Sequence, residues 1–273
     1  MTTHDEAKAR AAATYNAAAD HYDNPANVFW DHFGATTVAR LALPPGGRVL
    51  DACCGSGASA LPAAQAVGPG GSVIAVDLAD GLLALARHKA RRLGLTNVEF
   101  RQADLMATGF PPGHFHAVVC VFGIFFLPDM PAAVRELWRL VAPGGQLAIT
   151  TWGPRFFEPV TTEFWNAVRG VRPDLYKAFN PWDRIATPDA LSGLLADAGI
   201  DDRDVVAQAG SHAIPSPDAW WAAVMGSGYR GTIDQMHARE RDQVRAANES
   251  FIRQAGVARV EANVVYARAT KPR

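Results

Sequence analysis

The fold of this 273-residue chain is decided by one stretch near its beginning, Val49-Leu50-Asp51-Ala52-Cys53-Cys54-Gly55-Ser56-Gly57-Ala58-Ser59-Ala60. The apolar pair Val49-Leu50 predicts a short buried strand, and the Ala-rich segment after the glycines predicts a helix. Between them, Gly55-x-Gly57-x-x-Ala60 has the spacing of a nucleotide-binding turn, in which glycine supplies dihedral angles that other residues avoid. Alone, the same pattern also fits a plain tight turn between a strand and a helix.

Outward from this turn, strands and helices alternate. Further strands are expected at 72–76, 98–100, 116–121 and 146–151, with helices up to about 67 and at 78–93 and 131–140. This alternation is typical of an α/β fold, a doubly wound parallel sheet with helices on both faces. Two helices, 4–22 and 27–42, are expected before it. A helix at 188–198, a strand near 205–206, a helical stretch at 217–255 and a last strand at 262–267 are expected after it.

Acidic residues follow three successive strands, at Asp51, Asp77 and Asp104. A carboxylate at Asp51 would repel the phosphates of a dinucleotide, whereas it suits a ligand with cationic groups, such as S-adenosylmethionine. Asp77 is placed to accept hydrogen bonds from ribose hydroxyls, and Asp104 from an adenine amino group. Each acid alone could instead cap a helix. Together with the glycines they favour one extended cofactor pocket.

With these residues the chain resembles the class I S-adenosylmethionine-dependent methyltransferases. The resemblance continues through Val73-Ile74-Ala75-Val76-Asp77-Leu78, Asp104-Leu105, Phe115-His116-Ala117-Val118-Val119 and Leu140-Val141-Ala142-Pro143-Gly144-Gly145. Cys53 departs from the pattern, because the family often has its first glycine there. The Cys-Cys-Gly form is similar to that of the ubiquinone and menaquinone C-methyltransferases, as is the segment Tyr15-Asn16-x-x-Ala19-x-x-Tyr22-Asp23. The resemblance implies a Rossmann-like seven-stranded sheet whose last strand is antiparallel.

The resemblance also implies which residues bind the cofactor. It places Asp51 and the backbone of Ala52, Cys53 and Gly55 toward the methionine part. It places Asp77 at the ribose, Leu78 against the adenine ring, and Asp104 and Leu105 at the adenine edge. Phe122, just past the fourth strand, would lie near the methionine amino group, and Tyr15 and Tyr22 would cover the cofactor from the N-terminal helices.

The charge and composition of the chain argue against some classes of binding partner. Lys and Arg number 26 against 27 Asp and Glu, so the net charge of −1 gives no basic footprint for nucleic acid. The first residues have no basic and apolar signal-peptide pattern, and the longest apolar run, 117–127, is shorter than the roughly 18 residues of a membrane span. Three cysteines, Cys53, Cys54 and Cys120, suit a reducing compartment better than a disulfide framework. A cytoplasmic protein without a membrane span is expected; its oligomeric state is left open.

Aromatic residues are concentrated in one segment. Of 25 aromatic residues, eight lie within 152–182: Trp152, Phe156, Phe157, Phe164, Trp165, Tyr176, Phe179 and Trp182. Such an insert either builds its own small core or covers the strand ends as a lid. The lid predicts substrate contacts from Trp30, Phe126, Trp152 and Phe156. The chain then divides into an N-terminal helical cover (1–43), a cofactor-binding core (44–151), the aromatic insert (152–187) and a C-terminal completion of the sheet (188–273).

The chemistry of the acceptor is less constrained. The segment 120–128 lacks both the Asn/Asp-Pro-Pro-Tyr/Phe motif and the metal-binding acids of other methyltransferases, and no metal site is expected. Weak candidates for a general base are His21, His32, His114 and Glu158, each more often structural. The sequence therefore predicts a methyltransferase that acts on a small, largely apolar or aromatic molecule. A cofactor-binding protein that does not methylate, or that catalyses another reaction, is the alternative, and a dinucleotide oxidoreductase is a more distant one.

Overall fold

The computed structural model describes residues 4–273, which contain a large sheet and a two-stranded ribbon. The sheet strands are β1 (Arg48–Ala52), β2 (Ser72–Asp77), β3 (Val98–Gln102), β4 (Phe115–Val121), β5 (Val141–Trp152), β6 (Arg203–Gln208) and β9 (Val264–Thr270). Within the described residues these seven strands lie in the order β3-β2-β1-β4-β5-β9-β6. Strands β1 and β4 lie near the centre, where Leu50 and Val118 are fully buried.

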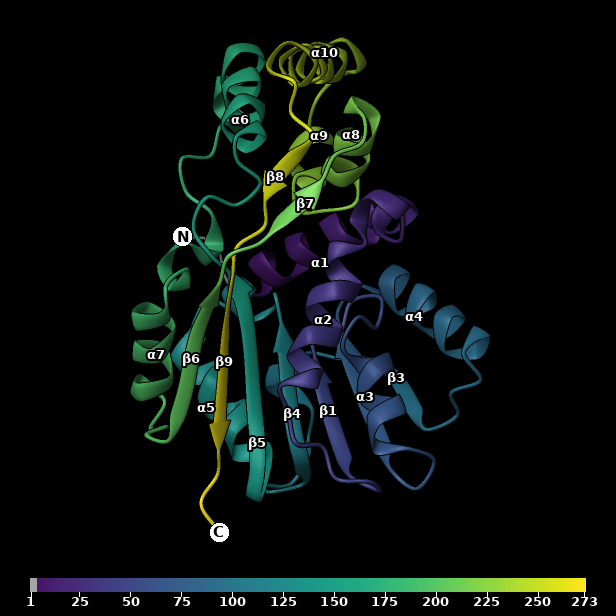
Figure 1. Ribbon diagram of the computed structural model, residues 1–273, viewed down its shortest axis with the longest axis vertical. Coiled ribbons are helices and arrows are strands. Elements are labelled where there is room, and N and C mark those ends of the chain that lie inside the picture. The colour runs from purple at the N-terminus through teal and green to yellow at the C-terminus, as the bar shows by residue number, and fades with distance from the viewer. Residues whose placement is uncertain (1–3) are drawn as a thin grey trace.

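Strand direction follows the expectation. Strands β3, β2, β1, β4 and β5 pair in parallel, and β9 runs antiparallel to both β5 and β6. The predicted doubly wound sheet with an antiparallel last strand is therefore confirmed. Because β1, β2, β4 and β5 are parallel, their carboxyl ends meet at one edge of the sheet, as Figure 1 shows at the top of the strands.

Helices cover both faces of the sheet. On one face lie α2 (Phe29–Ala39), α3 (Ala60–Val67) and α4 (Asp80–Arg92), and on the other lie α5 (Met130–Leu140) and α7 (Pro188–Asp197) (Figure 1). Helix α5 illustrates why these segments form helices. The side chain of Asp129 accepts a hydrogen bond from the Ala132 N–H at its start, and Val134 and Leu137 bury one face against the sheet.

The remaining helices lie beyond the carboxyl ends of the strands. Helix α1 (His4–Tyr22) crosses above these ends, and α6 (Val160–Val171), α8 (Pro217–Met225), α9 (Arg230–Ile233) and α10 (Ala238–Ala255) form a layer farther out (Figure 1). Helix α10 packs on α6, and α1 contacts α4, α8 and α9. No helix in residues 4–273 is long and apolar enough to cross a bilayer.

Three features differ from the expectation. The ribbon of β7 (Ser211–Ala213) and β8 (Arg259–Glu261) was not predicted, because strands of three residues carry no detectable alternation. The helical stretch 217–255 is broken into α8, α9 and α10 after Gly226. Strand β5 begins at Val141, earlier than predicted, and its pairing with β4 shifts register between Phe115 and Ala117.

Candidate functional site

The turn after β1 brings the backbone close to its neighbours. Cys53, Gly55 and Gly57 all have positive φ, of 60°, 51° and 89°. Gly57 needs its missing side chain, because a Cβ there would lie 3.1 Å from Cγ of Leu61. The turn after β4 approaches just as closely, since a Cβ on Gly123 would lie 2.4 Å from Cβ of Cys53. The two strand-end turns therefore pack directly on one another.

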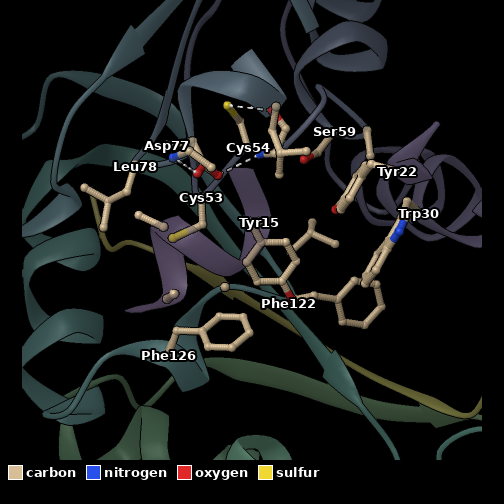
Figure 2. Close-up of a pocket in the computed structure, with 18 residues that line it drawn as sticks. Tyr15, Tyr22, Trp30, Cys53, Cys54, Ser59, Asp77, Leu78, Phe122 and Phe126 are labelled. Atoms are coloured by element: carbon tan, nitrogen blue, oxygen red, sulfur yellow. Dashed lines mark hydrogen bonds between the residues drawn. The ribbon is translucent and has the colours of Figure 1, made fainter. Parts of the chain in front are cut away.

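A cavity opens at these turns, beneath α1. Its wall includes side chains from both N-terminal helices and from the ends of β1, β2 and β4 (Figure 2). The residues predicted at the cofactor that line it are Tyr15, Tyr22, Cys53, Gly55, Asp77, Leu78 and Phe122. In Figure 2 the ring of Tyr15 lies between Asp77 and Phe122. The structure thus brings together most of the residues that the sequence singled out.

Asp77 is the acid on the cavity wall. Its Oδ2 accepts a hydrogen bond from the Gly55 N–H at 2.8 Å, and its Oδ1 accepts one from the Ala79 N–H at 2.8 Å. Burial raises the pKa of Asp77, and the backbone donors oppose this shift. A carboxylate offers about four acceptor positions, so two remain for hydroxyl groups of a ligand.

Asp51 and Ala52 lie beneath the turn instead of on the cavity wall. Both are fully buried, and Oδ2 of Asp51 accepts from the Ser59 hydroxyl at 2.7 Å. Burial raises the pKa of Asp51 to about 7, against the hydrogen bond from Ser59. Its Oδ1 is buried without a hydrogen-bond partner in the described chain. Ser59 itself lines the cavity, so the influence of Asp51 on a ligand passes through Ser59 and through its negative field.

Asp104 and Leu105 line a recess that continues from this cavity past Cys53, Asp77 and Leu78. Lys8 of α1 forms an ion pair with Asp104. Partial burial opposes ionisation of Asp104, but the hydrogen bond from Lys8 keeps its pKa below the ordinary value. An adenine amino group would therefore share this carboxylate with Lys8.

The tyrosines of α1 cover the cavity. Burial, and then the charge of a neighbouring group (Asp77 for Tyr15, Tyr15 for Tyr22), raise the pKa of both hydroxyls, so both stay protonated. Tyr22 stacks on Trp30 with ring centroids 5.2 Å apart and an interplanar angle of 2°. Phe122 stacks on Trp152 with centroids 4.0 Å apart. Aromatic rings, among them those of Tyr22, Trp30 and Phe122, thus form one side of this cavity.

A second cavity of about 520 Å³ adjoins the first and shares Tyr15, Trp30, Phe122 and Phe126 with it. All four residues predicted to contact the substrate, Trp30, Phe126, Trp152 and Phe156, line it. The insert closes one side, because Trp182 packs edge-on against Phe125 and Phe156 at centroid distances of 5.5 and 4.9 Å. Its volume lies in the range of small-molecule pockets.

The weak base candidates do not reach either cavity. His21 is hydrogen-bonded to Asp20, and the carboxylate of Glu158 accepts from Thr162 at the start of α6. His114 stacks on Phe110, just before β4 and hence at the opposite end of that strand. His32 lines a separate groove beside β7. In residues 4–273, no group of three or more His, Cys, Asp or Glu side chains could hold a metal.

Some wall residues were not singled out from the sequence, among them Ser59, Leu82 and Gly123. Ser59 carried a usable signal, because a serine just before a helix at a Gly-rich turn stands where helix-capping residues are common. In the structure its hydroxyl donates to Asp51 instead. Leu82 lies in the first turn of α4, and Gly123 follows β4. Only the packing of the turns shows that they meet.

Comparison with known proteins addresses the same segment. Residues 49–145 match the family described as "Methyltransferase domain". This segment is the one in which the sequence resembles the class I methyltransferases. The seven-stranded sheet, mostly parallel with β9 antiparallel, is the fold that this resemblance implies.

Relatives of the methyltransferase domain include two quinone methyltransferases. A 2-phytyl-1,4-naphtoquinone methyltransferase of Synechococcus elongatus is 38% identical over 124 residues, which are 45% of this chain and 53% of that protein. A demethylmenaquinone methyltransferase of Lactococcus lactis is 32% identical over 142 residues, 50% of this chain and 56% of that protein. The match thus spans about half the length of these relatives.

Among solved structures, a SAM dependent methyltransferase from Aquifex aeolicus superposes with a TM-score of 0.53 at 23% identity. The superposition covers 69% of this chain and 89% of that one, and it supports the fold. S-adenosylmethionine is the cofactor that the resemblance to this family implies.

The residues present fit this cofactor. The buried carboxyl group of Asp51 and the partly buried one of Asp77 give the site a negative field when ionised, which suits an ammonium and a sulfonium and would oppose a pyrophosphate. Asp77 keeps acceptor positions for a ribose, and the apolar side chains of Leu78 and Leu82 line the same wall for a flat ring. The orphaned Oδ1 of Asp51 is a further acceptor beneath Ser59.

Proposed function

We propose that the protein transfers a methyl group from S-adenosylmethionine to a small aromatic or apolar molecule. The observation that carries this proposal is the adjacency of two cavities that share Tyr15, Trp30, Phe122 and Phe126. One cavity carries the acid and glycine set suited to the cofactor, and the other is lined by aromatic rings. The bound cofactor supplies an electrophilic methyl group on its sulfonium.

In this proposal the chain acts mainly by positioning. Asp77 would hold the ribose hydroxyls, and Ser59, fixed by Asp51, would contact the methionine part. The stack of Phe122 on Trp152 would form the wall that aligns the acceptor. Holding two reactants in line can contribute up to about 7–11 kcal/mol to lowering the barrier.

The second cavity carries no carboxylate or imidazole in the part of the chain described, so no such base is available to the acceptor. A reactive acceptor would therefore arrive as a nucleophile that ionises readily, such as a phenol, an enol or a quinol. The two quinone methyltransferase relatives support the quinol class in particular. The carbon or oxygen atom that receives the methyl group is set by the pose of the ring.

We further infer that the insert, residues 152–187, is the substrate cover and that the N-terminal helices α1 and α2 cover the cofactor. Trp182 and Phe156 of the insert line the second cavity, and Tyr15, Tyr22 and Trp30 of the N-terminal segment line the first. Such covers exclude water and commit the substrate. A cytoplasmic location, predicted from the sequence, agrees with the free thiols of Cys53, Cys54 and Cys120.

The test is transfer of labelled methyl from S-adenosylmethionine to a panel of naphthols, naphthohydroquinones, catechols and aromatic amines. The proposal expects transfer to at least one hydroxylated or reduced aromatic ring and production of S-adenosylhomocysteine in equal amount. Binding of the cofactor without transfer to any member of the panel would favour a binding protein on this fold. The variant Asp77→Ala is the matched negative control.

A further inference from the structure

The mouth of the second cavity is cationic. Three of its lining residues carry positive charge: Arg10 on α1, and Lys177 and Arg184 on the insert. All three are exposed at the opening. No Asp or Glu among residues 4–273 lines the same cavity.

These cations lack counterions. In the described chain none of the three forms an ion pair with a carboxylate, whereas Arg172 and Arg230, on nearby elements, each bind two. Lys177 and Arg184 contact aromatic rings instead. Lys177 lies 5.8 Å from the ring centre of Trp165, and Arg184 lies 5.7 Å from that of Phe179.

Two of these cations also repel one another. Loss of hydration at the Lys177 ammonium, and then the charge of Arg10, lower the pKa of Lys177. A bound anion would relieve this repulsion, and the rings leave the donor groups free to hydrogen-bond to it. Phe179, between the two insert cations in sequence, is 51% exposed, so the same edge also offers an apolar surface.

We propose that the methyl acceptor carries a carboxylate, which Lys177, Arg184 and Arg10 bind at the mouth while its ring enters the aromatic cavity. This inference rests on the proposed function in one respect, that the bound molecule is the methyl acceptor. The binding site for the carboxylate does not itself depend on catalysis. Such a site would distinguish this protein from a methyltransferase whose acceptor is an uncharged aromatic ring. It also assigns residues 177–184 as the segment that determines specificity.

The experiment compares two probes of the same shape, 6-hydroxy-2-naphthoate and its methyl ester. Their binding is measured by quenching of tryptophan fluorescence, with and without S-adenosylhomocysteine, at low and high salt. The variants are Lys177→Gln with Arg184→Gln, the same pair with Arg10→Gln, and Arg92→Gln as control. Arg92 is an exposed arginine at the end of α4, away from both cavities.

The wild type is expected to bind the acid at least about tenfold more tightly than the ester, and less so at high salt because exposed charges are screened. The double and triple variants should lose this preference while ester binding stays, and Arg92→Gln should keep it. Equal binding of acid and ester by the wild type, or a preference that survives the triple variant, overturns the inference.

A preference for the acid without any binding of S-adenosylhomocysteine would contradict the proposed function and leave the anion site standing. Binding of S-adenosylhomocysteine with equal affinity for acid and ester would do the reverse. Melting temperatures of all variants, measured in the absence of ligand, show whether a loss of binding comes from unfolding.

Discussion

The N–H of Gly55 donates a hydrogen bond to Oδ2 of Asp77 at 2.8 Å, which ties the turn after β1 to the end of β2. Asp77, the acid that suits the ribose, is thus held by Gly55 in the turn that follows the neighbouring strand β1. Its second oxygen is held by the N–H of Ala79, so the carboxylate cannot rotate away from the cavity. This pairing sets the geometry on which cofactor binding depends.

Replacement of Asp77 by alanine should weaken binding of S-adenosylhomocysteine by about ten- to a hundredfold, because hydrogen bonds to a charged acceptor contribute about 1.5–3 kcal/mol. Equilibrium dialysis measures this change. The control is Asp80→Asn, which alters an exposed acid paired with Arg87 in the first turn of α4. Comparable losses in both variants would contradict the assigned role.

Asp51 predicts a pH dependence of stability in the cofactor-free protein. Burial raises its pKa from 3.8 to about 7, so the folded protein binds a proton more tightly than the unfolded chain. The free energy of unfolding should therefore fall as the pH rises from about 4 to about 7, by up to about 4 kcal/mol from this group.

The measurement is urea unfolding of the wild type and of Asp51→Asn across this range. The difference between them isolates Asp51, because Asp77 and the other acids titrate in both proteins. The variant should gain relative to the wild type as the pH rises. A difference that does not change with pH would show that Asp51 keeps an ordinary pKa.

The close approach of the two turns predicts a steric effect. A Cβ on Gly123 would lie 2.4 Å from Cβ and 2.8 Å from Sγ of Cys53, so Gly123→Ala should destabilise the protein by about 1–3 kcal/mol. Gly193→Ala is the matched control in helix α7, where a Cβ meets nothing within 4 Å. That variant should gain about 0.5–1 kcal/mol. Chemical unfolding compares them, and equal effects would contradict the account of the turn.

The position of the insert predicts that a substitution there weakens substrate binding without changing cofactor binding. Because Trp182 packs on Phe125 and Phe156, Trp182→Ala should raise KM for an aromatic acceptor about tenfold and leave the Kd of S-adenosylhomocysteine unchanged. Trp221→Ala, on α8 and outside both cavities, is the control. An equal loss of cofactor binding in Trp182→Ala would show that the insert serves the fold as a whole.

Much of the fold could be predicted from the sequence, because the signals were local. The Gly-rich turn, most of the apolar strands and the acids after them lie within about one hundred residues, and their alternation with helices indicates a parallel sheet. The ribbon of β7 and β8 could not be predicted, since its two strands of three residues each are too short to carry a pattern and lie about fifty residues apart.

Less of the candidate site than of the fold could be predicted from the sequence. The sequence placed Asp51 and Asp77 at the same edge, but it could not show that Asp51 points beneath the turn and acts on Ser59. From the sequence, Arg184 could either pair with an acidic group of the substrate or be an ordinary solvated surface residue, and nothing there joined it to Arg10 and Lys177. Arg10 and Arg184 lie 174 positions apart, and their common cavity exists only after α1 crosses the strand ends.

The most direct test of the central claim is a calorimetric titration of the purified protein with S-adenosylhomocysteine and, separately, with NADH. We expect one S-adenosylhomocysteine bound per chain, with binding about ten- to a hundredfold weaker in Asp77→Ala. We expect no comparable binding of NADH, whose pyrophosphate the acids of this site oppose. Tight binding of NADH together with no binding of S-adenosylhomocysteine would contradict the central claim.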